Sequence, residues 1–491
     1  MKNTFLLSTI GTFFSASIFA NPTLPAQEQD RINQRLDDQR IEDKIPSQPA
    51  QQQQSTPQSS SAEGEKGTLS ITKEELAQQP ELVIRAMLSA LAQNNGGNIE
   101  FLLPVYHQIP EQYQDPLITK WANAIVEKRQ KNYRTAIELY RSIVAEQNDI
   151  LPVRLQLAIT LFENNETEAA EDQFEKLRSE QLSPELQDLI SQYLAAIANQ
   201  NPWSFSGGLT YLNDPNINNA PDAGTTIGNW SAPARESGQG AGFNFNIGKK
   251  WAWGNGFFNE VRADSNGKYY WNNKKYNEYT ARGSVGLGFQ NANQTITLLP
   301  FIEQTWYAGG SSKSETVKRF SQASGATLES QYWFSPQWQL NTTYEYAEQR
   351  YRSRKHLNGN YHFIGGNLVY LHNAKQYWFV GANFNRTSTR DKDDSYIRRG
   401  IQAGWGQEWG WGLSTRLSVN FARKNYYAPM PIFNITQRNR EYGVNASIWH
   451  RAVHYWGITP RLTWSYSKIK SNHAFYTYDK HRVFIEFSKQ F

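Results

Sequence analysis

Apolar and polar residues alternate with a period of two over most of the C-terminal part of the chain. In the segment 413–423, Leu417 and Val419 are apolar, whereas Arg416 and Ser418 beside them are polar. Successive side chains of a β-strand point to opposite faces, so each such segment has one apolar and one polar face. An apolar outer face and a wet inner face are typical of transmembrane β-barrels. The pattern therefore predicts a barrel that crosses a membrane.

The alternation divides into fourteen predicted strands. Their approximate cores are residues 204–212, 241–252, 257–264, 277–289, 294–307, 319–333, 337–349, 360–371, 375–387, 396–408, 413–423, 438–449, 457–469 and 480–491. Short connections follow the even-numbered strands and long connections follow the odd-numbered ones. In outer-membrane barrels the short turns face the periplasm and the long loops face outward. An even strand number then leaves both ends of the barrel domain in the periplasm.

The last strand carries a pattern of its own. Val483, Ile485 and Phe487 lie on one side of the two-residue period, and the chain ends in Phe491. This arrangement resembles the assembly signal of bacterial outer-membrane barrels. Lys489 departs from it, because such signals usually have another apolar residue there.

Residues 69–202 change to an apolar spacing near 3.6 and predict a helical domain. Within it a set of packing residues recurs after 34 residues, namely Trp121, Ala124, Ala136 and Tyr140 as Leu155, Ala158, Ala170 and Phe174. Small residues let two helices approach closely, and the aromatic fills the gap to the next hairpin. The spacing resembles tetratricopeptide repeats, with capping helices expected near 73–93 and 184–199. A generic helical bundle is the alternative. Stacked hairpins build concave surfaces that bind proteins, which favours a docking module.

The first 68 residues predict no packed structure. Lys2, the apolar stretch from Phe5 to Phe19 and Ala20 are typical of a secretory signal peptide over residues 1–20. Residues 21–68 are polar and rich in Gln, Ser and Pro, which predicts a disordered periplasmic linker.

Composition narrows the possible chemistry. The chain has no cysteine, which excludes disulfides, cysteine-ligated zinc and thiol catalysis. Through residue 202 there are 17 Lys+Arg and 27 Asp+Glu, and from residue 203 there are 33 and 18. The basic C-terminal part favours a basic lumen, or loops that face anionic lipid headgroups, over nucleic-acid binding.

No motif for a catalytic centre, a cofactor or a metal is apparent. His450 and His454 are four residues apart but flank a predicted turn, and the run Asp391–Asp394 lacks the glycine and distal glutamate of a calcium loop. We interpret the first as a membrane-interface feature and the second as a solvated loop tip. Four charged residues are expected to point into the lumen, where they either guide a passing chain or pair with one another: Arg416, Arg461, Glu345 and Glu486.

A signal peptide, a short helical-repeat domain and a fourteen-stranded barrel in one chain resemble the surface lipoprotein assembly modulators, or Slam proteins. These are the outer-membrane components of type XI secretion. The resemblance implies a non-enzymatic translocon that moves specific client proteins, either surface lipoproteins or soluble haem- and metal-scavenging proteins, across the outer membrane. It also implies outer-membrane lipids, periplasmic chaperones and the barrel-assembly machinery as partners. No nucleotide site is apparent, so the driving energy is expected to come from client folding or capture outside.

Three other functions fit parts of the pattern. A polysaccharide-export porin also joins helical repeats to a barrel, but it usually has more repeats and sixteen strands. A lipid-modifying enzyme needs a Ser/His pair, and His362 and His372 have no evident partner in the sequence. A passive nutrient channel leaves the helical domain without a use.

For a translocon, the first and last strands form the candidate gate. Gly207 and Gly208 in the first strand either weaken its pairing or only permit a bend.

Overall fold

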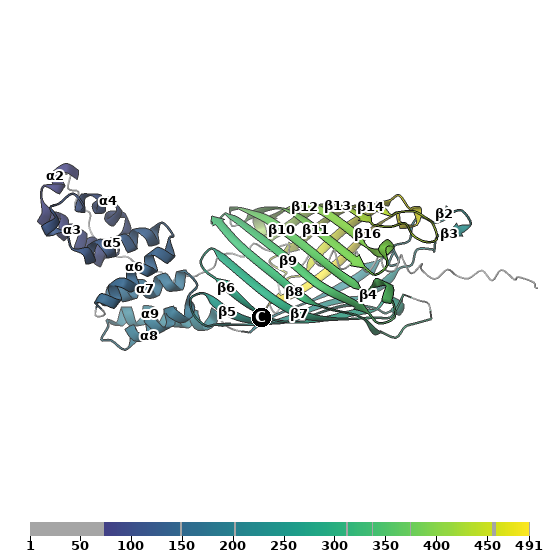
Figure 1. Ribbon diagram of the computed structural model, residues 1–491, viewed down its shortest axis with the longest axis horizontal. Helices are drawn as coiled ribbons and strands as arrows, with labels where there is room; N and C mark the ends of the chain where they lie inside the picture. The colour runs from purple at the N-terminus through teal and green to yellow at the C-terminus, as the bar shows by residue number, and fades with distance from the viewer. Residues whose placement is uncertain are drawn as a thin grey trace, which may run out of the picture.

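The computed structural model describes residues 73–147, 150–200, 203–310, 313–335, 337–373, 375–453 and 458–490. A group of helices is followed by a closed barrel, and the helices stand at one end of the barrel (Figure 1). The predicted signal peptide and linker lie outside the described residues. None of the helices in the described part is long and apolar enough to cross a membrane.

The helical part consists of consecutive antiparallel hairpins. Its elements are α2 (Lys73–Ala77), α3 (Pro80–Ala92), α4 (Gly96–Tyr106), η1 (Glu111–Tyr113), α5 (Pro116–Arg129), α6 (Tyr133–Glu146), α7 (Leu151–Glu163), α8 (Thr167–Arg178) and α9 (Pro184–Gln200). The prediction of one capping helix near 73–93 was wrong. Pro80 begins a new helix there, since proline lacks the amide hydrogen that an unbroken helix needs, and α4 then pairs with α3 as a further hairpin.

The same turn closes each of the three hairpins. Asn94, Lys131 and Asn165 have positive φ angles of 50°, 66° and 60°. The amide that follows each of them donates to a carbonyl five residues back, at 2.9 Å in all three turns. This geometry is the left-handed helix cap called the Schellman motif. The repeat is therefore visible in the turns as well as in the packing residues.

The predicted repeat residues form the core of the helical part. Ala124, Ala136 and Tyr140 of the α5–α6 hairpin are fully buried, and so are Ala158, Ala170 and Phe174 of the α7–α8 hairpin. Trp121 and Leu155 pack partly buried against the same core. The tetratricopeptide-like prediction is confirmed.

The rest of the described chain is a closed antiparallel barrel of fourteen strands, which confirms the predicted fold class. The strands are β1 (Ser204–Asp214), β4 (Gly238–Ala252), β5 (Phe257–Tyr270), β6 (Glu278–Gln290), β7 (Gln294–Tyr307), β8 (Lys318–Ser335), β9 (Trp338–Tyr351), β10 (Gly359–Asn373), β11 (Gln376–Thr389), β12 (Tyr396–Glu408), β13 (Leu413–Tyr426), β14 (Arg438–His450), β15 (Arg461–Ser471) and β16 (Tyr478–Gln490). Each strand pairs with its neighbours in sequence, and β1 pairs with β16 to close the ring.

Two predicted strand boundaries were clearly wrong. β5 was predicted to end at residue 264 but continues through Gly267 to Tyr270. Gly267 leaves room for the stacked rings of Phe243 and Tyr279, and a Cβ there would lie 2.5 Å from the Tyr279 ring. β15 begins at Arg461 rather than at residue 457, directly after Pro460, which cannot donate a ladder hydrogen bond.

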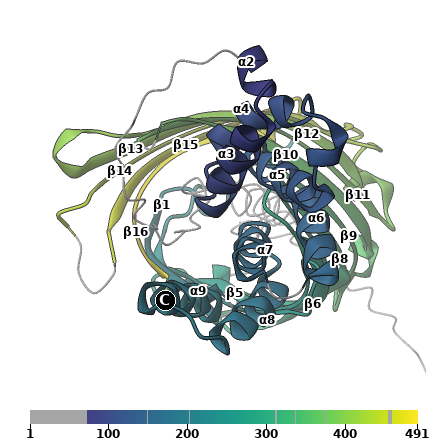
Figure 2. The ribbon, with the colours of Figure 1, turned by 90° about the vertical axis from the view of Figure 1, so that its left-hand side faces the viewer.

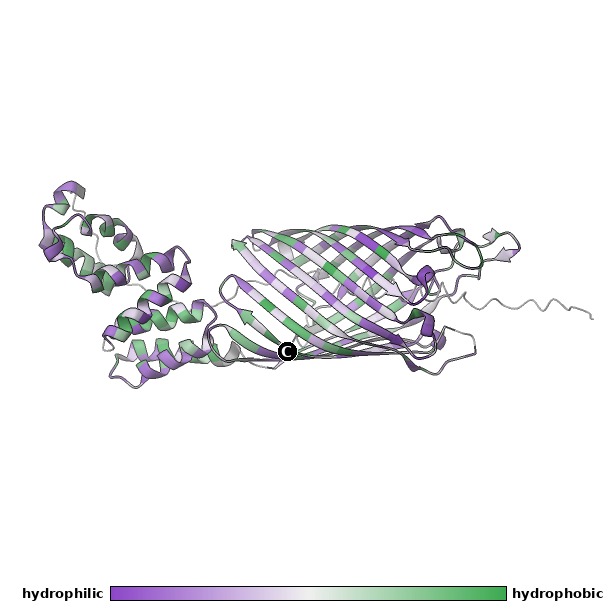
Figure 3. Cartoon of the chain, in the orientation of Figure 1, coloured by the Kyte–Doolittle hydropathy of each residue, from purple (hydrophilic) through white to green (hydrophobic). Residues whose placement is uncertain are grey.

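Along the barrel strands hydrophobic and hydrophilic residues alternate, and the ribbon is mostly hydrophilic at the end away from the helices (Figure 3). At that end, four long loops contain the same short turn, namely η2 (Lys274–Tyr276), η3 (Lys355–Leu357), η4 (Lys392–Asp394) and η6 (Ala474–Tyr476). After each turn, an Asn, Ser or Thr side chain accepts a hydrogen bond from a strand-end amide, as Asn277 does from Tyr270 at 2.6 Å and Asn358 does from Tyr351 at 2.7 Å. A small hairpin of β2 (Thr226–Ile227) and β3 (Trp230–Ser231) lies in the loop after β1.

The helices meet the barrel at the end that carries the short connections (Figures 1 and 2). The Asn165 side chain, in the turn between α7 and α8, donates to the Asn291 carbonyl at 2.9 Å. Asn291 belongs to the turn between β6 and β7. Since short turns face the periplasm, this contact places the helical part on the periplasmic side.

Candidate translocation site

Successive side chains of the barrel wall point alternately to the outer surface and to the lumen. The outward-facing Tyr344, Leu417 and Leu462 are exposed, whereas Glu345, which follows Tyr344, is buried. All four charged residues predicted to face the lumen lie on the inner side of this alternation: Glu345, Arg416, Arg461 and Glu486.

One half of the lumen wall is joined by a network around Glu345. Its carboxylate accepts hydrogen bonds from Tyr361 at 2.7 Å, Thr327 at 2.8 Å and Arg282 at 3.0 Å. The Arg282 guanidinium also lies 3.4 Å from the centre of the Phe301 ring. These residues come from β6 through β10, so the network links five neighbouring strands.

A second network lies next to the first. The Arg262 guanidinium on β5 donates to Glu260 at 2.6 Å and to Glu329 on β8 at 2.8 Å. Charge-assisted hydrogen bonds of this kind are roughly twice as strong as neutral ones. The wall from β5 to β10 is therefore held by side chains in addition to its backbone ladder.

The other half of the lumen wall carries many cations. Arg398 on β12 donates to Glu441 on β14 at 2.8 Å. Arg416 lies over the Phe379 ring and Arg461 over the Trp449 ring, at 5.4 Å and 4.5 Å from the ring centres. For Arg416 and Arg461, the contact with an aromatic ring is thus part of what holds each side chain against the wall.

The closing seam between β1 and β16 is paired over only part of its length. The ladder runs from Ser206 opposite Gln490 to Tyr211 opposite Ile485. Beyond Tyr211, the last three residues of β1 pair with β4 alone within the described part of the chain. The seam therefore has ladder pairs in its periplasmic half and lacks them in its outer half.

A lysine bridges the outer half of the seam. The Lys480 ammonium on β16 donates to Asp214 at 3.1 Å and to Asn219 at 2.8 Å, and it also reaches the Asn216 carbonyl at 3.4 Å. The side chains of Lys480 and Asp214 are nearly buried. We call these four residues the seam latch. Sequence alternation places Lys480 on the inner face, but its partners depend on barrel closure, which brings residues more than 260 positions apart into contact.

The predicted gate glycines lie in the paired half of the seam. Gly207 is opposite Lys489 and Gly208 is opposite Ser488. On the other side, the Phe245 ring covers Gly207 and the Asn244 amide covers Gly208, and a Cβ at these positions would lie 2.9 Å and 2.4 Å from them. The glycines therefore make room for side chains of β4.

The remaining candidates fall in different places. Val483, Ile485 and Phe487 face outward and are exposed, and Phe491 lies outside the described residues. His362 contacts the Tyr344 hydroxyl at 3.0 Å and His450 ends β14, whereas His454 lies outside the described residues. The described residues contain no cluster of three or more potential metal ligands.

The acidic run after β11 forms part of an outer loop. Residues Lys392–Asp394 form η4 there. Burial and the neighbouring carboxylate of Asp393 raise the pKa of Asp394 to about 6, against the opposing effect of His356, whose ring lies 3.9 Å away.

Comparison with known proteins agrees with this architecture. A family model described as surface lipoprotein assembly modifier matches residues 203–491, and one for the N-terminal TPR repeats of the same proteins matches residues 69–174. The chain belongs to the surface lipoprotein assembly modifier family. The resemblance expected from the order of its parts is thereby confirmed, and a closed barrel of this family places the protein in the bacterial outer membrane.

Similar proteins of known name cover between 77% and 98% of the chain. Surface lipoprotein assembly modifier 1 of Haemophilus influenzae strain Rd is 45% identical over 98% of this chain and 98% of its own. The protein of the same name in Neisseria meningitidis serogroup B is 35% identical over 87% and 86%. The hemophilin secretion modulator of Acinetobacter baumannii is 22% identical over 77% and 79%.

Proposed function

We propose that this protein is an outer-membrane translocon that moves specific client proteins from the periplasm to the cell surface or the medium. The names of its relatives support surface lipoproteins and a haemophilin-type protein as the two kinds of client. The structural support is the stack of helical hairpins at the periplasmic end of a barrel whose closing strands, β1 and β16, pair over only part of their length. The protein acts without catalysis and without a cofactor in this proposal.

The two parts divide the work. Residues 69–202 form the periplasmic module that receives the client, and residues 203–491 form the barrel, after a signal peptide over 1–20 and a linker over 21–68. Asn165 ties the client-receiving hairpins to the barrel rim. Client folding outside the cell supplies the driving energy. Lipids, periplasmic chaperones and the barrel-assembly machinery are the further partners of this proposal.

The seam is the proposed lateral gate. The networks around Glu345 and Arg262 hold the opposite wall together, so opening costs least where the β1–β16 ladder stops and the seam latch takes over. Breaking the latch would let the seam open from its outer end and then through the six ladder pairs below, which include those of Gly207 and Gly208.

Deletion of the gene in its own host tests the proposal. Surface-shaved proteins, culture supernatant and surface polysaccharide are compared with those of the parent strain. Loss of one or two exported proteins, with their retention in the periplasm, supports a translocon and identifies the clients. Loss of a polymer with unchanged proteins would support the polysaccharide-export porin instead.

A further inference from the structure

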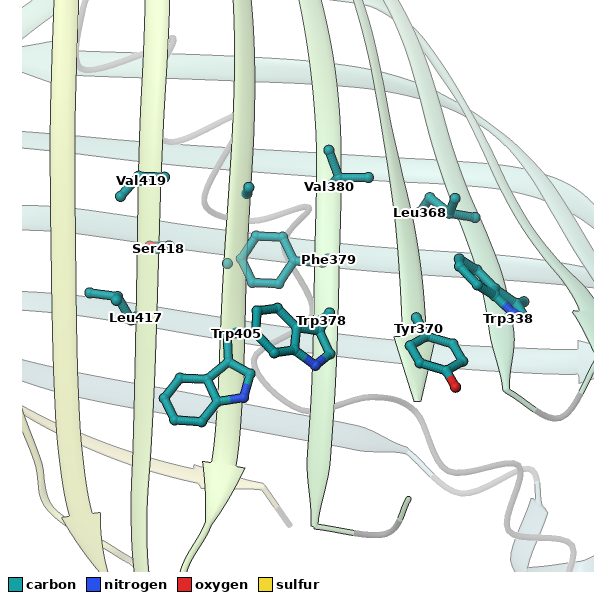
Figure 4. A pocket seen from close by; sticks show the side chains of 12 residues that line it. Trp338, Leu368, Tyr370, Trp378, Phe379, Val380, Trp405, Leu417, Ser418 and Val419 are labelled. Carbon is teal, nitrogen blue, oxygen red and sulfur yellow. The ribbon is translucent and has the colours of Figure 1, made fainter. Parts of the chain in front are cut away.

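A hollow of about 480 Å³ lies on the outer surface of the barrel, across β9 to β13 (Figure 4). Its lining is almost entirely apolar and includes Trp378, Val380, Trp405, Leu417 and Val419. A volume of this size falls in the range that holds a small ligand.

The hollow exists because one outward residue is small. Ala403 on β12 lies opposite Val380 on one side and Val419 on the other. Along its own strand, the outward neighbours are Ile401 and Trp405, which are also larger. The methyl group of Ala403 thus forms a depression among bulky side chains.

On the inner face of the wall, a bulky side chain packs behind this depression. The next residue, Gly404, points to the lumen, and the Phe379 ring packs where its side chain would be. A Cβ on Gly404 would lie 2.3 Å from that ring. The wall is therefore filled from inside by Phe379 but left unfilled outside at Ala403.

A row of aromatic side chains marks the depth of the hollow in the membrane. Trp338 is opposite Tyr370, Tyr370 is opposite Trp378, and Trp378 is opposite Trp405. The row lies near the short turns, hence at the periplasmic boundary, where Trp and Tyr are enriched in membrane proteins. The hollow therefore opens to the acyl chains of the periplasmic leaflet.

We propose that the hollow is a binding site for one acyl chain of a glycerophospholipid from the periplasmic leaflet. Lys375 supplies the polar contact. It is exposed in the turn before β11, three residues from Trp378, where its ammonium can meet a lipid phosphate. The site lies on the side of the barrel where Tyr361 of β10 anchors the Glu345 network. A bound lipid there would fix this wall in the membrane while the seam moves.

The test uses the full-length protein and phosphatidylethanolamine. Native mass spectrometry counts the lipids retained on the purified protein at a fixed lipid excess. The wild-type protein is expected to keep one lipid that Ala403→Phe loses, with at least a tenfold drop in occupancy. Ala263→Phe is the matched control, because Ala263 is an exposed outward alanine on β5. Gel electrophoresis checks that each variant is folded, since a folded barrel gives a band that shifts when the sample is heated. Ala403→Leu replaces Ala403→Phe if the latter fails to fold.

Two further arms identify the ligand. Lys375→Glu should weaken binding of phosphatidylethanolamine while leaving diacylglycerol unaffected. If Ala403→Phe retains as much lipid as the wild-type protein, the proposed binding site is wrong. If Ala263→Phe loses as much lipid as Ala403→Phe, the retained lipid is bound non-specifically. Displacement of the phospholipid by an equimolar diacylated lipopeptide would overturn the assignment in favour of a client lipid anchor.

Discussion

At the scale of single residues, Lys480 holds the outer half of the seam. Replacing it by methionine keeps the length of the side chain but leaves the Asp214 carboxylate, which is nearly buried, without this cation. We expect Lys480→Met to lower the free energy of unfolding by about 2 kcal/mol. Urea titration of the purified barrel measures this, with the exposed Lys470→Met on β15 as control.

A second substitution separates the ion pair from simple packing. Removing both charges, in Lys480→Met with Asp214→Asn, avoids a buried unpaired carboxylate and should cost less than Lys480→Met alone. If the loss in free energy of unfolding of the double variant equals the sum of the losses of the two single variants, the two side chains do not stabilise each other. Their ion pair then contributes nothing to the stability of the seam.

Asp394 makes the outer loop sensitive to pH. Its pKa is raised from 3.8 in the unfolded chain to about 6. The folded protein then binds this proton more tightly than the unfolded chain does, so ionisation between pH 4 and 6 removes stability, and the loss is complete above pH 6. Asp394→Asn should therefore be more stable than wild type at pH 7.5, by about 1 kcal/mol after allowance for solvent screening.

The same comparison at low pH provides the control. Near pH 4 the wild-type carboxyl is mostly protonated in the folded state, so Asp394→Asn and wild type should unfold at nearly the same urea concentration. A difference that is the same at pH 4 and pH 7.5 would show that the substitution acts through packing rather than through the proton.

At the scale of elements, the helical hairpins depend on three left-handed turn residues. Lys131 pays the conformational cost that a Cβ imposes at a φ of 66°, which is about 1 kcal/mol for a non-glycine residue. Lys131→Gly should raise the thermal transition of the helical part of the full-length protein, followed by circular dichroism at 222 nm. Gln130→Gly, one residue earlier at a φ of −77°, should lower it.

These elements also show how far sequence patterns reach. The 34-residue repeat and the two-residue alternation were enough to predict the repeat core and fourteen strands, because both signals come from local burial. β5 was predicted too short, because the run Ser265–Lys268 contains no apolar residue and shows no alternation. In the fold, the rings of Phe243 and Tyr279 pack over Gly267. The partners of Glu345 and Lys480 were missed, because register between distant strands decides them.

At the scale of the whole molecule, the question is which side of β1 moves. Thr210 on β1 is opposite Glu486 of β16 on one side and Gly242 of β4 on the other. Since the chain has no cysteine of its own, the pair Thr210→Cys with Glu486→Cys closes the seam by a single disulfide. Directly opposite residues lie close enough for such a bond after small adjustments.

If the seam is the gate, oxidation of this pair should abolish client display at the cell surface, and a reductant should restore it. The pair Thr210→Cys with Gly242→Cys is the matched control, because it joins the same residue to a strand that is paired along its full length and should leave display unchanged. Mass spectrometry confirms each crosslink. Full display with a complete β1–β16 crosslink would mean that clients pass through the lumen, past Arg416 and Glu345, and that the partly paired seam serves barrel assembly instead.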